Sequence, residues 1–284
     1  MDITNLQAFI AVTETGSFSR ASEHIHITQP AVSKRIAALE STLETKLFDR
    51  IGRQVTLTEG GRVLLPRAHQ ILLEIEDSRR LLGNLSKQVG GALKMATSHH
   101  IGLHHLAPVL RQFSARYPAV ELDLHFMESE EACKVIHHGD LELGVITLPL
   151  ETDTDLNIQR LWPDPLAVVV GKPHPLYSRV PDSLADLLVH PAILPERGTY
   201  TRELIEKAIN ETITVRMSTN YMETIKMLVS VGMGWSVLPR TMLSNELRVI
   251  EIDELKIQRE LGVVWHAQRT LSNAAKKMIE VLSV

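Results

Sequence analysis

A chain of 284 residues is long enough for two or more domains, each with its own hydrophobic core. Hydrophobic residues make up 44% and charged residues 23%, as in ordinary globular proteins, and a net charge of −4 does not by itself point to a nucleic acid as partner. No signal peptide and no apolar run of the roughly 18 residues that span a membrane is visible, and the one cysteine, Cys133, excludes an internal disulfide. These features predict a cytoplasmic protein without membrane contact.

The first 45 residues predict three helices separated by short turns. Apolar residues recur at helical spacing from Ile3 onward, and Gly16 ends the run. Ser17 is a suitable N-cap for a short second helix, "FSRASEHI". After the turn "HIT", Thr28 can cap a third helix, in which Pro30 occupies the first turn and loses no helical hydrogen bond. This order is typical of a helix-turn-helix, whose second helix places its N-terminal half in a DNA major groove.

The predicted third helix has an apolar face and a polar face. Val32, Ile36 and Leu39 are expected to be buried because they recur at spacings of four and three. A hairpin of two short strands follows in "LFDRIGRQVTLTEGG", with an arginine on each side of Gly52. Such a hairpin can lay its arginines along phosphates or in a minor groove. The polar face of the helix carries Gln29, Ser33 and Lys34, with Arg35 beside them.

A heptad pattern of apolar residues follows the hairpin and is interrupted only by Ser78. Pro66, near its start, predicts a bend or a late start of the helix. The segment "GNLSKQVGG" ends the helix and marks a domain boundary. The pattern can form a dimer interface or can pack against the chain's own domain, and its length and its place between two domains favour the dimer. Its members are Leu64, Ala68, Ile71, Ile75, Ser78, Leu82, Leu85 and Val89.

From "ALKMA" onward, predicted strands alternate with helices, which indicates an α/β domain with mostly parallel pairing. Ligands of open α/β sheets bind at the carboxyl ends of the strands. One strand ends at "TSHH", another ends at Thr147, and "RGTYTRE" leads into a helix, whose free N–H groups favour an anion. These segments are candidates for a ligand cleft, and the alternative is that they are ordinary capped loops. The residues expected at the cleft are Thr97, Ser98, His99, His100, Thr147, Gly198, Thr199 and Tyr200.

The motif "HHIGLHH" resembles a metal-binding cluster. His100 and His104 would share one face of a regular helix, as zinc ligands do. However, Gly102 interrupts or starts the helix, and no carboxylate lies nearby in the sequence. The four histidines, His99, His100, His104 and His105, are therefore interpreted as a polar strand-to-helix loop, and no metal ion is expected.

Catalytic motifs are missing from the sequence. It contains no G-x-S-x-G, no H-E-x-x-H and no phosphate loop, so no catalytic residue, no enzymatic activity and no cofactor are predicted. Cys133 lies among apolar neighbours of a predicted helix and is expected to be a buried small hydrophobe, since a redox sensor would need a second cysteine. A transport or storage binding protein would account for residues 91–284 but not for the helix-turn-helix.

The chain resembles the LysR-type transcriptional regulators. The motifs "LQAFIAVTETGSFSRAS", "TQPAVSKRIAALE", "LFDR" and "LTEGG" occur in the order and spacing of that family, and "VGMGWSVLP" follows its plan. The resemblance implies an all-α winged helix-turn-helix domain (residues 1–60), a dimerising linker helix (61–90) and an α/β effector-binding domain (91–284). That last domain would consist of two Rossmann-like subdomains similar to a periplasmic binding protein.

The resemblance also implies the partners and the boundaries of the subdomains. Subdomain I is expected at 91–162 and 267–284 and subdomain II at 163–266, with crossovers near 161–163 and 265–267. The implied partners are double-stranded promoter DNA, a small-molecule effector, RNA polymerase, and further copies of the chain in a dimer of dimers. The chemistry of the predicted cleft adds the expectation that the effector is anionic. The residues placed at DNA are Gln29, Pro30, Ser33, Lys34, Arg35, Arg50 and Arg53; the residues placed at the dimer interface are Leu64, Ala68, Ile71, Ile75, Leu82 and Leu85.

Overall fold

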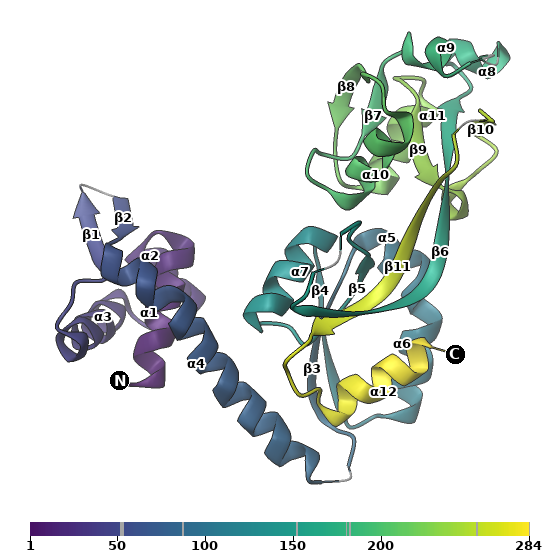
Figure 1. Cartoon of the computed structure of the whole chain (residues 1–284). Coiled ribbons are helices and arrows are strands. Elements are labelled where there is room, and N and C mark those ends of the chain that lie inside the picture. The colour runs from purple at the N-terminus through teal and green to yellow at the C-terminus, as the bar shows by residue number, and fades with distance from the viewer. Residues whose placement is uncertain are drawn as a thin grey trace. The chain divides into compact units, whose positions relative to one another are not determined.

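The protein consists of two compact units, Met1–Leu85 and Ser86–Val284, shown in a computed structural model (Figure 1). The structure describes residues 1–51, 54–86, 88–151, 153–179, 181, 183–253 and 255–283. Within these ranges, no helix combines the length and the apolar character that a membrane crossing requires.

The first unit begins with three helices, as the sequence predicts. Gly16 ends the first helix in the left-handed conformation, with φ of 60°, and the Ser17 hydroxyl accepts the Arg20 N–H at the start of the second. Thr28 is the N-cap residue of the third helix, as predicted, although among the described residues its hydroxyl makes no cap hydrogen bond. The helices are α1 (Ile3–Thr15), α2 (Phe18–His24) and α3 (Gln29–Leu43).

The core of the first unit fixes α3 and the hairpin together. Val32, Ile36 and Leu39 are buried, as predicted. The hairpin of β1 (Phe48–Ile51) and β2 (Gln54–Leu57) is antiparallel. The Glu40 carboxylate of α3 accepts the Leu47 and Phe48 N–H groups at the start of this hairpin. The predicted order of helix, turn, helix and two-stranded wing is therefore confirmed.

The long helix α4 (Glu59–Asn84) begins earlier than predicted and ends within "GNLSKQVGG", as predicted. It begins at Glu59, where the Thr58 hydroxyl accepts the Gly61 N–H, so Pro66 lies inside the helix and does not delay its start. The helix continues through the proline because Leu65 and Ala68 pack on the core of the first unit. It ends before Val89, which packs on the core of the second unit and therefore does not belong to the apolar heptad pattern of the helix.

The second unit is built on a seven-stranded sheet with the order β10-β6-β11-β5-β3-β4, and β9 also pairs with β6. The predicted strands and helices are present, but the prediction of mostly parallel pairing is wrong. Within the described part of this sheet, the parallel pairs are those of β3 with β4 and with β5. The long strands β6 and β11 pair antiparallel with each other, and each pairs antiparallel with its other neighbours. The strands are β3 (Gly91–Thr97), β4 (Val120–Phe126), β5 (Leu143–Thr147), β6 (Leu156–Gly171), β7 (Ala192–Leu194), β8 (Val215–Ser218), β9 (Ser236–Pro239), β10 (Leu247–Ile250) and β11 (Ile257–His266).

The mixed pairing arises because β6 and β11 run through both subdomains as one long ribbon (Figure 1). The register of this pair shifts between Leu261 and Gly262, where β11 begins to pair with β5 of subdomain I. The second crossover was predicted near 265–267 and lies instead at Leu261. The strand pattern "LGVVWH" conceals this because apolar residues continue on both sides of the crossover.

Helices cover the sheet of each subdomain and form the cores. In subdomain I, α6 and α12 pack against each other, and α12 packs on β3. A short parallel pair, β7 and β8, completes subdomain II. The helices of the unit are α5 (His99–Ile101), the π-helix η1 (Gly102–Leu106), α6 (Ala107–Arg116), α7 (Ser129–His138), α8 (Pro175–Ser178), α9 (Leu184–Leu188), α10 (Tyr200–Ile209), α11 (Met222–Ser230), the 3-10 helix η2 (Arg240–Met242) and α12 (Asn273–Leu282).

Candidate functional site

The first unit exposes polar side chains at the N-terminal half of α3. Gln29, Pro30 and Lys34 are exposed, and Ser33 and Arg35 are half-buried. Because Val32 and Ile36 are buried on the opposite side, the core fixes which face α3 presents. The helix can therefore offer an amide, a hydroxyl and cations to one surface, which is the chemistry that reads bases and phosphates in a major groove.

The structure describes less of the two arginines predicted at the wing than of the polar residues of α3. Arg50 lies in β1, where its backbone pairs with Val55 across the hairpin. Arg53 lies outside the described residues. Their contact with DNA stays a prediction.

The predicted dimer residues fall into two groups along α4. Ala68 is 0% exposed and belongs to the core of its own unit, so it has no surface to offer a partner. Leu64 and Ile71 are partly covered by the same core. Toward the end of the helix, Leu82 and Leu85 are 69% and 79% exposed. The first residues of the heptad pattern thus pack against their own domain, which was the alternative to a dimer interface. The last residues of the pattern are exposed and available to another chain.

A cleft in the second unit collects residues from the carboxyl ends of several strands. Of the eight residues predicted there, five line it: Ser98, His99, His100, Thr147 and Thr199. Ser98 and Thr199 are the N-caps of α5 and α10. The strand-end rule therefore identified both walls of the cleft.

Three predicted residues do not line the cleft. The Thr97 side chain is buried and donates its hydroxyl to the Val145 carbonyl at 2.9 Å. Gly198 has a φ of 85° and supplies the turn before α10. Tyr200 contributes its backbone N–H to a contact with Glu130, while its ring packs on the core of subdomain I that contains Cys133. Cys133 is buried, as predicted, and burial raises the pKa of its thiol.

Sequence reasoning missed the remaining lining residues. Some follow strand ends, so the same rule applied to "HFMESEE" and "STNYME" would have found them. Arg259 lies inside β11, where no local pattern distinguishes it. The missed residues are Glu128, Ser129, Glu130, Pro195, Thr201, Asn220, Met222 and Arg259.

Arg259 and Asp164 form a buried ion pair at the inner end of the cleft. They face each other in the register of β11 and β6, and Arg259 Nε donates to Asp164 Oδ2 at 2.6 Å. Arg259 Nη1 donates to the Thr201 hydroxyl of α10 at 3.0 Å. Arg259 is 5% exposed, and its Nη2 has no hydrogen-bond partner among the described residues. One donor of the guanidinium is therefore available to a ligand of the cleft.

Carboxylates occupy the other side of the cleft. Burial, followed by repulsion from Glu130, Glu131 and Glu196, raises the pKa of Glu128 to about 7. Burial also raises the pKa of Glu130, whose carboxylate accepts the Tyr200 N–H at the start of α10. The helix N-terminus that was expected to receive an anionic ligand is thus occupied by an anionic group of subdomain I.

Contacts across the cleft hold the two subdomains together. His104 Nε2 lies 3.1 Å from Glu223 Oε1 of α11, and the His99 ring packs on Tyr221 with 5.5 Å between ring centroids. The volume left inside is about 30 Å³, roughly the share of one water molecule in the liquid. The enclosed space between the two subdomains is therefore small in this arrangement.

Comparison with protein families assigns both units. The family described as "LysR substrate binding domain" matches residues 86–283. The family described as "Bacterial regulatory helix-turn-helix protein, lysR family" matches residues 3–62.

Curated relatives extend over nearly the whole chain. The transcriptional regulator CbbR of Rhodospirillum rubrum is 31% identical, and the match covers 99% of this chain and 95% of CbbR. The transcriptional activator CmpR of Synechocystis is 27% identical, with 97% and 93% of the two chains covered. An uncharacterised regulator of Azotobacter vinelandii is 66% identical over 108 residues, which are 38% of this chain and 75% of that protein.

Solved structures show the same fold. A full-length OxyR variant from Pseudomonas aeruginosa has a TM-score of 0.69 at 24% identity, with 100% of this chain and 93% of OxyR covered. Full-length CbnR in complex with its target DNA has a TM-score of 0.65 at 21% identity, with 99% of both chains covered.

Proposed function

The chain belongs to the LysR family of bacterial transcriptional regulators, and from this premise we propose that it binds promoter DNA through α3 and the wing and responds to a small anionic effector in its cleft. Its relatives are transcriptional regulators, and the substrate-binding domain of the family is present. Because promoter DNA lies in the bacterial cytoplasm, the protein is proposed to act there. The proposed function needs no catalytic residue and no cofactor.

The DNA surface is proposed to divide its residues by role. Gln29 and Ser33 contact bases, since glutamine can pair with adenine through two hydrogen bonds and serine can bond to either base edge or phosphate. Pro30, Lys34 and Arg35, with Arg50 and Arg53 of the wing, position the domain on the sugar-phosphate backbone. The exposed polar face at the start of α3 supports this division.

The anionic character of the effector rests on the unpartnered Nη2 of Arg259. Leaving a buried donor without a partner costs free energy, which an anionic oxygen would recover. Glu130 accepts the Tyr200 N–H at the start of α10 and would have to leave when a ligand carboxylate or phosphate approaches that helix. The anionic group of the proposed ligand therefore takes the place of the Glu130 carboxylate at the start of α10.

The switch is proposed to act through the two crossover strands. Opening and closing of the subdomains about β6 and β11 would alter how effector domains pack in a dimer of dimers. That packing sets the angle between paired DNA-binding domains, and hence the DNA bend and contact with RNA polymerase. Effector binding contributes only through its different affinity for the two arrangements.

DNA binding is tested with purified protein and the DNA upstream of its own gene. Fluorescence anisotropy should show binding at least about a thousandfold tighter to this DNA than to random DNA of equal length. Equal affinity for both DNAs would exclude the upstream segment as an operator. The same titration at several salt concentrations gives the number of phosphate contacts.

The effector class is tested by thermal shift with small organic anions, amines and neutral analogues. A true anionic effector at about 100 times its Kd should stabilise the effector unit by about 2.7 kcal/mol. Arg259→Lys keeps the charge beside Asp164 but removes the free Nη2 donor, so the shift should become smaller. Stabilisation by amines but not by anions would refute the anionic assignment.

A further inference from the structure

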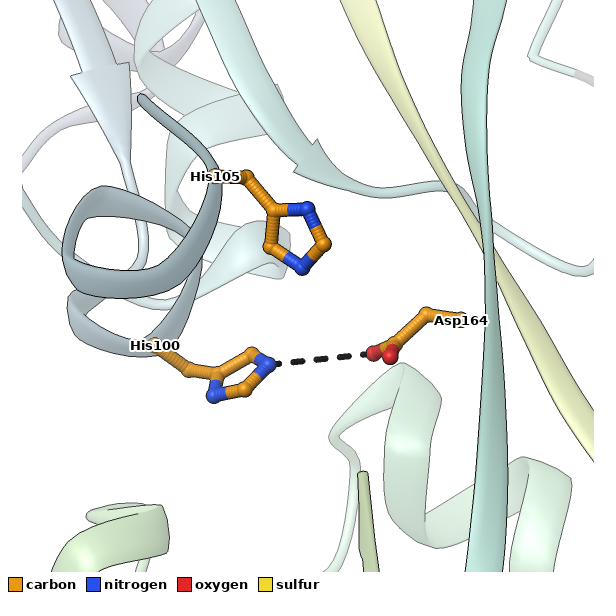
Figure 2. A group of neighbouring side chains, drawn as sticks. All are labelled: His100, His105 and Asp164. Carbon is orange, nitrogen blue, oxygen red and sulfur yellow. Dashed lines mark ion pairs between the residues drawn. The ribbon is translucent and has the colours of Figure 1, made fainter. Parts of the chain in front are cut away.

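Two histidines and an aspartate meet at the inner end of the cleft. His100 and His105 belong to the helical segment after β3, and Asp164 belongs to β6 near the crossover. One ligand atom from each residue lies within 4.8 Å of the other two. Figure 2 shows the two imidazoles and the carboxylate turned toward a common space, with 3.8 Å between His100 Nε2 and Asp164 Oδ2.

The π-helix determines which histidines meet. A regular α-helix would place His100 and His104 on one face, as the sequence suggested. In η1 (Gly102–Leu106) the wider turn carries His105 toward the space shared with His100. The His104 ring also packs on His100, with 4.7 Å between ring centroids, but its Nε2 lies 3.1 Å from Glu223 across the cleft and does not join Asp164. The carboxylate that the sequence neighbourhood lacks is supplied by Asp164, which lies far along the chain.

Several polar atoms around this space are buried without a hydrogen-bond partner among the described residues. They are both ring nitrogens of His100, Nε2 of His105 and Oδ1 of Asp164. His100 and Asp164 are only 5% and 1% exposed. Buried polar groups are normally satisfied, so a cluster of them aimed into one space is the environment expected of a ligand site.

The donor atoms suit a metal ion. Imidazole nitrogens and a carboxylate oxygen are ligands that Zn²⁺ takes in proteins.

Arg259 bonds to only one of the two carboxylate oxygens of Asp164 among the described contacts. Its Nε donates to Asp164 Oδ2 at 2.6 Å, and Oδ1 has no described partner. A hydrogen bond to one oxygen of a ligating carboxylate is a common way to orient it toward a metal. The positive charge of Arg259 would weaken cation binding, so a metal that gains strongly from imidazole nitrogen is favoured over Mg²⁺ or Ca²⁺.

We propose that His100, His105 and Asp164 bind a late first-row divalent metal ion, of the Zn²⁺ class, at the inner end of the cleft. Two imidazoles and one carboxylate leave at least one coordination position open. Ligand atoms around tetrahedral Zn²⁺ lie about 3.4 Å apart, so the three groups have to approach by about 1 Å, which rotation of the imidazoles can provide. The ion would connect α5 and η1 to β6.

The test measures Zn²⁺ binding to the full-length protein by calorimetry after treatment with a chelator. The wild type should bind one Zn²⁺ per chain at this site. His105→Gln should weaken that binding by at least about tenfold, while the matched control His104→Gln, one residue away in the same motif, should change it by less than about twofold. Zn²⁺ should also raise the melting temperature of the wild-type effector unit but not that of His105→Gln.

Three results would overturn the proposal. One is the absence of Zn²⁺ binding by the wild type, and another is unchanged binding by His105→Gln. The third is an equal loss in His104→Gln, which would assign the ion to the exposed histidines of the motif. His100→Gln adds a second ligand variant if His105→Gln fails to fold. The inference does not rest on the proposed function, because Zn²⁺ binding is measured without DNA or effector.

Discussion

The carboxyl group of Glu128 should make the stability of the effector unit depend on pH. Burial and neighbouring carboxylates raise its pKa in the folded protein to about 7, from an ordinary value of 4.5. Folding therefore favours the protonated form. The contribution of Glu128 to the free energy of unfolding is fully present below pH 4.5. This contribution is lost progressively as the pH rises from 4.5 through 7, and it does not change further at higher pH.

The size of this effect follows from the shift in pKa. A difference of about 2.5 units corresponds to at most about 3 kcal/mol. Because Glu128 is half-buried, solvent screening reduces the expected loss to about 1–2 kcal/mol between pH 5 and pH 8. In a unit of this size, that loss lowers the melting temperature by about 3–6 °C.

Thermal unfolding of the wild type and Glu128→Gln, followed from pH 5 to pH 8, measures the effect. Other groups titrate in this range, so the relevant quantity is the difference between the two proteins. Glu128→Gln should gain stability relative to the wild type as the pH rises. Glu121→Gln, which removes an exposed carboxylate from β4, is the matched control and should show no such trend. A difference between wild type and Glu128→Gln that does not vary with pH would refute the reasoning.

The other predictions concern DNA, assembly and the effector response. Gln29→Ala should cost about 1–3 kcal/mol on the operator and little on random DNA, measured by anisotropy, and equal losses on both would refute base reading. Leu82→Glu places a charge on the exposed end of α4 and should dissociate the dimer, whereas sedimentation showing an unchanged assembly would reject this interface. Ser98→Ala and Thr199→Ala should reduce the effector response in a binding assay while operator affinity without ligand stays within about twofold. An effector that binds both variants as it binds the wild type would remove these residues from the site.

The sequence by itself determined the parts of this protein that depend on neighbours along the chain. Gly16 and Ser17 mark helix ends through local conformation and local hydrogen bonds. The spacing of Val32, Ile36 and Leu39 selects the buried face of α3, and thereby the exposed one. Strand ends located Ser98 and Thr147 in the cleft, because the carboxyl ends of parallel strands meet at one edge of a sheet.

Only the tertiary structure decided how distant segments meet. Arg259 and Asp164 are 95 positions apart, and their contact depends on the register of β11 on β6, which no local pattern encodes. Ala68 fits a seam by its spacing, but the core of the first unit covers it. His105, and not His104, completes a cluster with His100 and Asp164 because the helix widens to a π-turn from Gly102. Spacing along the chain identifies which side chains share a face, whereas packing and register decide what that face touches.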